Sequence, residues 1–276
     1  MPMTDLEPGP QPTPATAGRA LYVFCLARAG AVARLAWADL VPDLALNLMT
    51  VRDVIAVTAS VNLNDYCGPD AEAHMGDLSW IGPRACRHEA VVECAMSAAP
   101  VVPARLATLF SSRHRLVAWI EEHYSVVVEA LDRFAEHQEW AVKGAVNTAE
   151  AEAPLLTAAL ARASLPAAPG ARYLQERRIR AGIGMELRAW VARTCEEVTQ
   201  ELSAFAVDMR ERPLGPHVVK ETSTPIMNHA FLVPRSLVDA FRARVAQVDA
   251  LYAERGTTIS CSGPWPPYSF CPQLGE

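Results

Sequence analysis

Residues 139–146 read EWAVKGAV, and they begin the part of the chain whose order of elements decides the fold. Trp140, Val142 and Val146 are separated by two or four positions, so in an extended chain their side chains lie on one face. We therefore predict that this stretch is a β-strand.

A connector and a long helix are predicted after this strand. Residues 147–170 are rich in Ala and Pro, and we expect them to form the connector. The helix is indicated by residues that recur at helical spacing, and Pro213, Gly215 and Pro216 close it. The residues that define its buried face are Ile183, Leu187, Trp190, Thr194, Val198, Leu202 and Phe205.

Two strands, a second helix and a last strand complete the pattern. HVVKETS at residues 217–223 and IMNHAFLV at residues 226–233 are predicted as strands. Ser236 is expected to cap the second helix, which stops at Gly256, and TTISCS at residues 257–262 is the last strand. The residues that this helix is expected to bury are Leu237, Phe241, Val245, Val248 and Tyr252.

The resulting β-α-β-β-α-β order is typical of the ferredoxin-like arrangement, in which two helices cover one face of an antiparallel sheet. We assign this domain to residues 138–262. It would be followed by an extended C-terminal tail at residues 263–276.

The first half of the chain predicts a separate α+β unit. RALYVFCLA at residues 19–27 suits a buried strand. Residues 44–62 suit two strands that turn near Arg52 and Asp53, although the pattern also fits a short helix. A helix is expected from Leu78 to Pro100. A second amphipathic helix is indicated by Leu116, Ile120, Tyr124, Val127, Leu131 and Phe134.

The fold class predicted from these elements is α+β with two domains. The N-terminal α+β domain is assigned to residues 19–137. Residues 1–18 contain five prolines and almost nothing apolar, so we expect a disordered tail there.

Composition limits the classes of function. The chain has 276 residues, of which 51% are hydrophobic, and a formal net charge of −6. An acidic chain without a basic stripe argues against binding nucleic acid or an anionic membrane. The seven cysteines are scattered and include no C-x-x-C pair. Residues 1–18 contain no signal peptide, and no apolar run is long enough to span a membrane. These features predict a cytoplasmic protein.

The usual catalytic and ligand-binding motifs are incomplete. GIGMEL at residues 182–187 lacks the third Gly and the preceding strand of a dinucleotide fingerprint. HEAVVE at residues 88–93 has Val92 where a zinc helix needs its second His, so His88 is interpreted as a core histidine bonded to a neighbouring carbonyl or carboxylate. Cys195 is interpreted as structural. We expect no enzyme activity, cofactor or metal.

A rigid aromatic strip, SGPWPPYSF, occupies residues 262–270. Pro264, Pro266 and Pro267 remove three backbone donors and predict an extended chain near polyproline II, with the rings of Trp265 and Tyr268 on one edge. Phe270 would lie on another edge. Two interpretations are compatible: the strip folds back on its own sheet as a clasp, or it docks on a partner.

The strip resembles the C-terminal signature of the gas vesicle accessory proteins of the GvpL/GvpF family. Four further stretches resemble that family in the same order along residues 20–271. They are DLSWIGPRACRHEAVV (77–92), PVVPARLATLF (100–110), EWAVKGAV (139–146) and YLQERR (173–178). The chain departs from the family where Leu106, Ala107 and Thr108 replace Phe-Gly-Thr, which puts a glycine-dependent turn in doubt.

This resemblance implies a non-catalytic role in building gas vesicles, through contact with the small, apolar shell protein and other vesicle proteins. The partner-binding residues that we select are Trp265, Tyr268, Phe270, Pro266, Pro267 and Arg105. Arg105 would fix a polar contact or join the two domains; the alternative for it is an intramolecular ion pair. The competing function is a regulatory small-molecule-binding module built on a ferredoxin-like domain.

Overall fold

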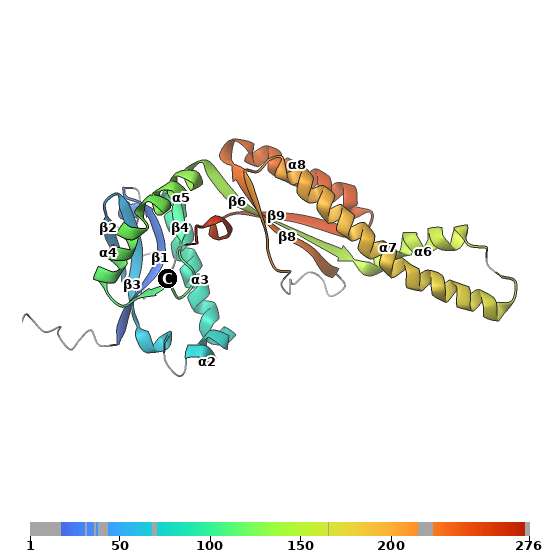
Figure 1. Ribbon diagram of the computed structural model, residues 1–276, viewed down its shortest axis with the longest axis horizontal. Coiled ribbons are helices and arrows are strands. Elements are labelled where there is room, and N and C mark those ends of the chain that lie inside the picture. The colour runs from blue at the N-terminus through green and yellow to red at the C-terminus, as the bar shows by residue number, and fades with distance from the viewer. Residues whose placement is uncertain are drawn as a thin grey trace, which may run out of the picture. The chain divides into compact units, whose positions relative to one another are not determined.

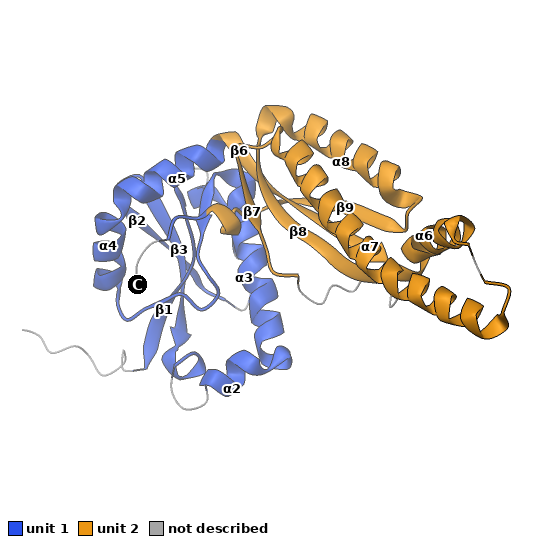
Figure 2. Cartoon of the chain, turned by 45° about the vertical axis from the view of Figure 1, so that its right-hand side comes forward, with its two compact units in different colours: residues 1–135, 271–276 blue, residues 136–270 orange. Residues whose placement is uncertain are grey.

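The computed structural model describes residues 18–30, 32–35, 37, 44–67, 71–164, 166–214 and 223–273. The chain forms two compact units, one of residues 1–135 with 271–276 and one of residues 136–270 (Figures 1 and 2). Each unit contains one antiparallel sheet with helices, so the prediction of mixed α and β structure is confirmed. The tail expected at residues 1–18 lies outside the described residues except for Gly18.

The sheet of the first unit has the strand order β2-β3-β1-β4. Its strands are β1 (Arg19–Arg28), β2 (Leu46–Val51), β3 (Val54–Asn62) and β4 (Val101–Pro103), and β5 (Leu109–Phe110) also pairs with β1. The turn between β2 and β3 falls at Arg52 and Asp53, as predicted. Short 3-10 turns, η2 (Val32–Arg34) and η3 (Leu63–Asp65), lie between the strands and helices.

The helices of this unit are α2 (Ala71–Gly76), α3 (Leu78–Ala98), α4 (Arg113–Glu122) and α5 (Tyr124–Glu136). The carboxylate of Asp77 caps α3 by accepting the N–H of Ser79 at 2.8 Å. The helix packs against the sheet through a core cluster that includes Val91, Val92 and Ala95.

One amphipathic helix was predicted across residues 116–134, and this is wrong because two helices meet at His123. The backbone N–H of His123 and its ring Nδ1 both bond to the carbonyl of Trp119, which ends α4. Four of the predicted apolar positions are nevertheless fully buried: Leu116, Ile120, Val127 and Leu131.

The sheet of the second unit has the order β7-β8-β6-β9, with all neighbours antiparallel. Its strands are β6 (His137–Asn147), β7 (Asp208–Glu211), β8 (Ser223–Pro234) and β9 (Thr257–Trp265). Trp140 pairs with Phe231 and Val142 with His229, so these side chains share one face. That face is covered by α7 (Pro169–Ser203) and α8 (Val238–Ala253), as Figure 2 shows.

The connector predicted at residues 147–170 is mostly helix. Thr148–Arg162 form α6, whose first turn is capped by the side chain of Asn147, and α7 already begins at Pro169. Ala has the highest helix propensity, and its abundance here outweighs the prolines.

The strand predicted at HVVKETS lies almost wholly outside the described residues. The strand that follows α7 is β7, which sequence reasoning missed because DMRE has a single apolar residue.

Ser236 is not the predicted helix cap. A 3-10 turn, η4 (Arg235–Leu237), precedes α8, and no side chain caps that helix. Leu237 is 38% exposed rather than buried, whereas Phe241, Val245 and Val248 are in the core as predicted.

Candidate functional site

The aromatic strip begins as part of the sheet of the second unit. Strand β9 continues to Trp265, which pairs with Glu139 of β6, and a 3-10 turn, η5 (Tyr268–Phe270), follows. Residues 263–265 of the tail predicted as extended over residues 263–276 are extended, but they belong to β9, and the 3-10 turn at Tyr268–Phe270 is not extended. The turn forms because Glu139 bonds to Ser269, as described below.

Gly263 has a backbone conformation that only glycine adopts readily. Its φ is +142°, and an added Cβ would lie 3.0 Å from the carbonyl oxygen of Glu139 and 3.2 Å from the ring of Trp140. The register between β6 and β9 also shifts between Glu139 and Ala141. This glycine therefore lets β9 pass close to β6 as the strip begins.

The rings of the strip differ in exposure. Trp265 is 38% exposed, and its indole N–H donates to the Ser262 hydroxyl at 3.1 Å. Phe270 is 6% exposed, Pro266 and Pro267 are buried, and Tyr268 is half-buried. The strip is thus anchored by its prolines and Phe270, and it presents Trp265 to solvent.

A buried carboxylate holds the turn in place. Glu139 is 1% exposed. It accepts the backbone N–H of Ser269 at 3.0 Å and the Ser269 hydroxyl at 3.1 Å. Arg212, just after β7, forms an ion pair with Glu139 and donates its Nε–H to the Ser269 hydroxyl at 2.9 Å. Three segments that are far apart in the sequence meet at this carboxylate.

The environment of Glu139 has two opposing effects on its pKa. Burial raises the pKa, and this effect is larger than the lowering by Arg212 and by the bonds from Ser269. Removal of one partner from a buried ion pair typically costs about 3–5 kcal/mol. This network therefore adds polar bonds at Ser269 to the apolar anchoring of the strip.

Sequence reasoning did not select Glu139, Arg212 or Ser269. The period-two pattern places Glu139 on the face opposite Trp140, and a glutamate inside a predicted central strand is the one signal that could have found it. Arg212 is 73 residues away along the chain, and no spacing rule links the two.

In the first unit, Tyr22 and His88 hold the segment that carries Arg105. Each of the two side chains is 3% exposed. The Nε2 of His88 lies 3.1 Å from the Ala104 carbonyl, which can only accept, so Nε2 carries the proton. The Tyr22 hydroxyl then donates to Nδ1 at 2.8 Å and accepts the Ala107 N–H at 3.2 Å. The predicted bond from His88 to a neighbouring carbonyl is confirmed.

The turn that the missing glycine put in doubt is formed by an alanine. Ala107 has a φ of +64°, and Thr108 donates both its N–H and its hydroxyl to the Arg105 carbonyl, at 3.1 and 2.7 Å. The Arg105 side chain is exposed, and no ion pair joins it to another described residue.

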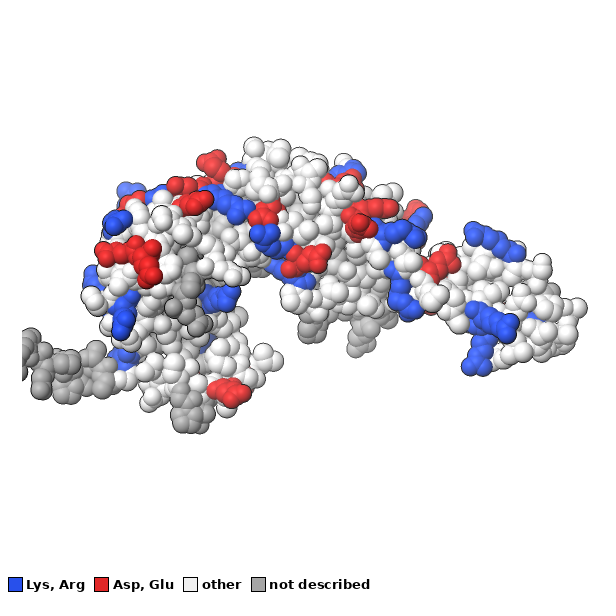
Figure 3. All heavy atoms as spheres, in the orientation of Figure 1, with Lys and Arg blue, Asp and Glu red and all other residues white. Residues whose placement is uncertain are grey.

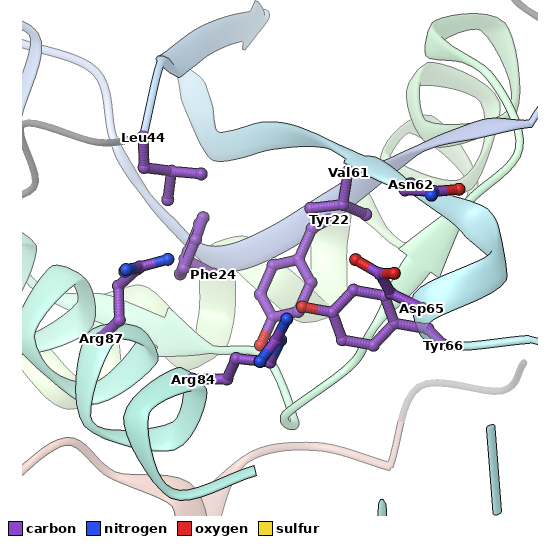
Figure 4. A pocket seen from close by; sticks show the side chains of 9 residues that line it. All are labelled: Tyr22, Phe24, Leu44, Val61, Asn62, Asp65, Tyr66, Arg84 and Arg87. Atoms are coloured by element: carbon purple, nitrogen blue, oxygen red, sulfur yellow. The ribbon is translucent and has the colours of Figure 1, made fainter. Parts of the chain in front are cut away.

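A small pocket lies beside this network in the first unit (Figure 4). Its volume is about 150 Å³, whereas ligand pockets typically start near 300 Å³. Arg84 stacks over the Trp80 ring at 3.8 Å, and Figure 4 shows its guanidinium reaching toward the Tyr66 hydroxyl. The lining residues are Tyr22, Phe24, Leu44, Val61, Asn62, Asp65, Tyr66, Arg84 and Arg87. The pocket lies outside the domain to which the small-molecule alternative assigns its ligand, so it does not bear on that alternative.

The remaining candidates have structural positions. GIGMEL lies inside α7. The Cys195 thiol donates to the Ile226 carbonyl at 3.4 Å, and burial raises its pKa. In the part of the chain that the structure describes, no three His, Cys, Asp or Glu side chains are grouped to hold a metal ion, and no helix could cross a membrane.

Comparison with known proteins gives the family. The profile of the family described as "Gas vesicle synthesis protein GvpL/GvpF" matches residues 20–272. This chain belongs to the GvpL/GvpF family. Gas vesicle protein L from Streptomyces sp. (strain CB03234) is 30% identical over 228 residues, which cover 81% of this chain and 82% of that protein.

Two solved structures share the fold. The crystal structure of the gas vesicle protein GvpF from Anabaena sp. PCC7120 superposes with a TM-score of 0.63, covering 92% of this chain and 96% of that one. GvpF from Microcystis aeruginosa gives 0.59, with 92% and 99% covered. Both are 16% identical to this chain.

Proposed function

We propose that this gas vesicle accessory protein binds the small, apolar shell protein, and other vesicle proteins, while the shell is formed. The observation that carries the proposal is the exposure of Trp265 on an otherwise anchored strip. Its ring is 38% exposed, whereas the two prolines that follow it are buried. An aromatic ring held in this way suits an apolar partner.

Two physical arguments support Trp265 as the main contact. Tryptophan is enriched among the few residues that dominate binding energies at protein interfaces. Pairing with β6 and the Glu139 network already order the backbone on both sides of the ring, so binding loses little further entropy. Tyr268 would add contact area. The buried residues Phe270, Pro266 and Pro267 would hold the strip that carries the Trp265 ring in place.

Arg105 is proposed as a second, polar contact. It is exposed at a turn whose backbone is held by Tyr22 and His88. The position from which its side chain extends is therefore fixed. The proposed role is non-enzymatic and places the protein at gas vesicles. We further propose that the second unit is a ferredoxin-like domain, which its order of elements and strands supports.

The test is binding of purified shell protein to the wild type and to Trp265→Ala, with thermal melts of both. We expect at least a tenfold loss of affinity, because truncating a hot-spot residue costs about 2 kcal/mol or more. The melting temperature should fall as well, because most of Trp265 is covered by the protein, so binding is compared at a temperature at which both proteins are folded.

Leu251→Ala is the matched control, because Leu251 is a 67% exposed apolar residue on α8 of the same unit. It should leave binding unchanged. Unchanged binding by Trp265→Ala would contradict the proposal, and a loss shared equally with Leu251→Ala would show that the effect is not specific to the strip.

A further inference from the structure

The helical hairpin of the second unit has a part in which no described residue is fully buried. Residues 152–182, from α6 into the first turns of α7, are called the arm here. Ala151 and Ile183 are buried, but none of the described residues between them is. Figure 1 shows α6 and this part of α7 extending beyond the sheet of their unit.

The arm is basic in an acidic protein. It carries two glutamates and five arginines, a net charge of +3, against −6 for the whole chain. Figure 3 shows blue spheres gathered at this end of the hairpin. The arginines are Arg162, Arg172, Arg177, Arg178 and Arg180.

The charge of the arm is combined with exposed apolar side chains. Leu174 is 59% exposed, and Met185, just beyond the arm, is 66% exposed. Leu174, Arg178 and Met185 are spaced by four and seven positions, so they share one side of α7. This side lies opposite the one that buries Ile183 and Leu187. Such a surface fits a partner that presents carboxylates around an apolar residue.

The first unit has a surface of that kind. Residues 1–135 and 271–276 contain 10 Lys and Arg and 16 Asp and Glu, a net charge of −6. On α4 and α5 the exposed residues Glu121, Glu122 and Glu129, with Val126 at 41% exposure, are called the acidic face here. Figure 3 shows red spheres over these helices, with blue spheres among them.

We propose that the arm of one copy docks on the acidic face of a second copy of this chain. Charge and apolar character match on the two surfaces, and both are present once in every copy. The contact is head-to-tail, so it can extend from copy to copy unless the rotation closes a ring. The proposal does not rest on binding of the shell protein.

The first consequence is self-association that weakens with salt, since exposed charges are screened. Sedimentation velocity of the full chain tests it, from about 5 to about 200 μM protein at low salt. We expect mean mass to rise with concentration, and the apparent dissociation constant to rise about tenfold between roughly 50 and 300 mM salt. A chain that stays monomeric at low salt over the whole concentration range overturns the proposal. The arm would then be expected to bind an acidic segment of another protein.

Charge reversal identifies the surfaces. Arg177→Glu/Arg178→Glu in the arm and Glu122→Arg/Glu129→Arg in the acidic face should each abolish the association. Mixed in equal amounts, the two variants should associate again, because each arm then meets a face of opposite charge. Two unfolded variants could not produce this rescue.

Arg34→Glu/Arg193→Glu is the matched control, since it makes the same charge change as the arm variant at exposed positions outside both surfaces. It should associate like the wild type. Association that survives both reversals, or that the mixture does not restore, overturns the assignment of these surfaces.

Discussion

In each unit two buried or half-buried side chains bond to the loop that carries the proposed contact residue. The two side chains are neutral in the first unit and charged in the second. In the first unit, neutral Tyr22 and His88 bond to the backbone of Ala104 and Ala107 and so position the turn of Arg105. In the second unit, charged Glu139 and Arg212 bond to Ser269 and so position the strip of Trp265.

The backbone beside each network has a residue with a positive φ. Ala107 adopts a φ of +64° in one unit, and Gly263 a φ of +142° in the other. In both units a network of hydrogen bonds holds a loop against a strand. The network is neutral and lies beside an alanine in the first unit, and it is ionic and lies beside a glycine in the second. The two solutions differ in how they respond to mutation and to pH.

The largest effect is expected from the ionic network. Glu139→Ala should lower the free energy of unfolding by about 3–5 kcal/mol, because it leaves the half-buried Arg212 and the Ser269 N–H without their acceptor. Chemical denaturation measures this loss. In a double-mutant cycle with Arg212→Ala, the two losses should be strongly non-additive. Additive losses would show that the ion pair does not act as a unit.

The neutral network should instead make stability depend on pH. Burial lowers the pKa of His88 to about 4, from an ordinary value near 6.5. Between these values the unfolded chain binds more protons than the folded one, so stability falls as pH drops from about 6.5 to about 4. The shift corresponds to about 3 kcal/mol in total.

His88→Gln provides the comparison for this prediction, because glutamine does not titrate. The wild type should lose about 3 kcal/mol more than this variant when unfolding is measured at pH 6.5 and again near pH 4. Equal losses in the two proteins would rule out His88 as the source.

The smallest effects should have opposite signs at the two turns. Gly263→Ala should cost about 2 kcal/mol, through the positive φ and the close approach to Glu139. Ala107→Gly should raise stability by about 0.5–1 kcal/mol, because release from the left-handed region outweighs the added flexibility of glycine. Thermal melts of both variants measure these changes. A loss of stability in Ala107→Gly would show that packing of the Ala107 methyl group stabilises the fold by more than the positive φ destabilises it.

Elements with a strong apolar period could be predicted from the sequence. Strands β1, β6 and β8 and helix α3 were predicted within a few residues, because burial of one face imposes a period that the sequence records. The buried positions of α8 followed from the same rule. The family resemblance of residues 20–271 was also visible in short motifs.

Elements without that period could not be predicted. Helix α6 has a single buried residue, Ala151, and strand β7 is four residues long. The turn at Tyr268 depends on a contact with Glu139 across 130 residues. Proline content predicted an extended strip near polyproline II, but the path of the strip depends on where these distant donors lie.

The separation between Glu139 and Ser269 has a consequence for how the protein is made. A nascent chain that has been synthesised as far as β9 contains all four strands of the second sheet. At that point the Ser269 donors are still missing, so the carboxylate of β6 has only part of its final set of bonds. Release of the next few residues from the ribosome supplies them. The second unit therefore reaches full stability only after the aromatic strip itself has been translated.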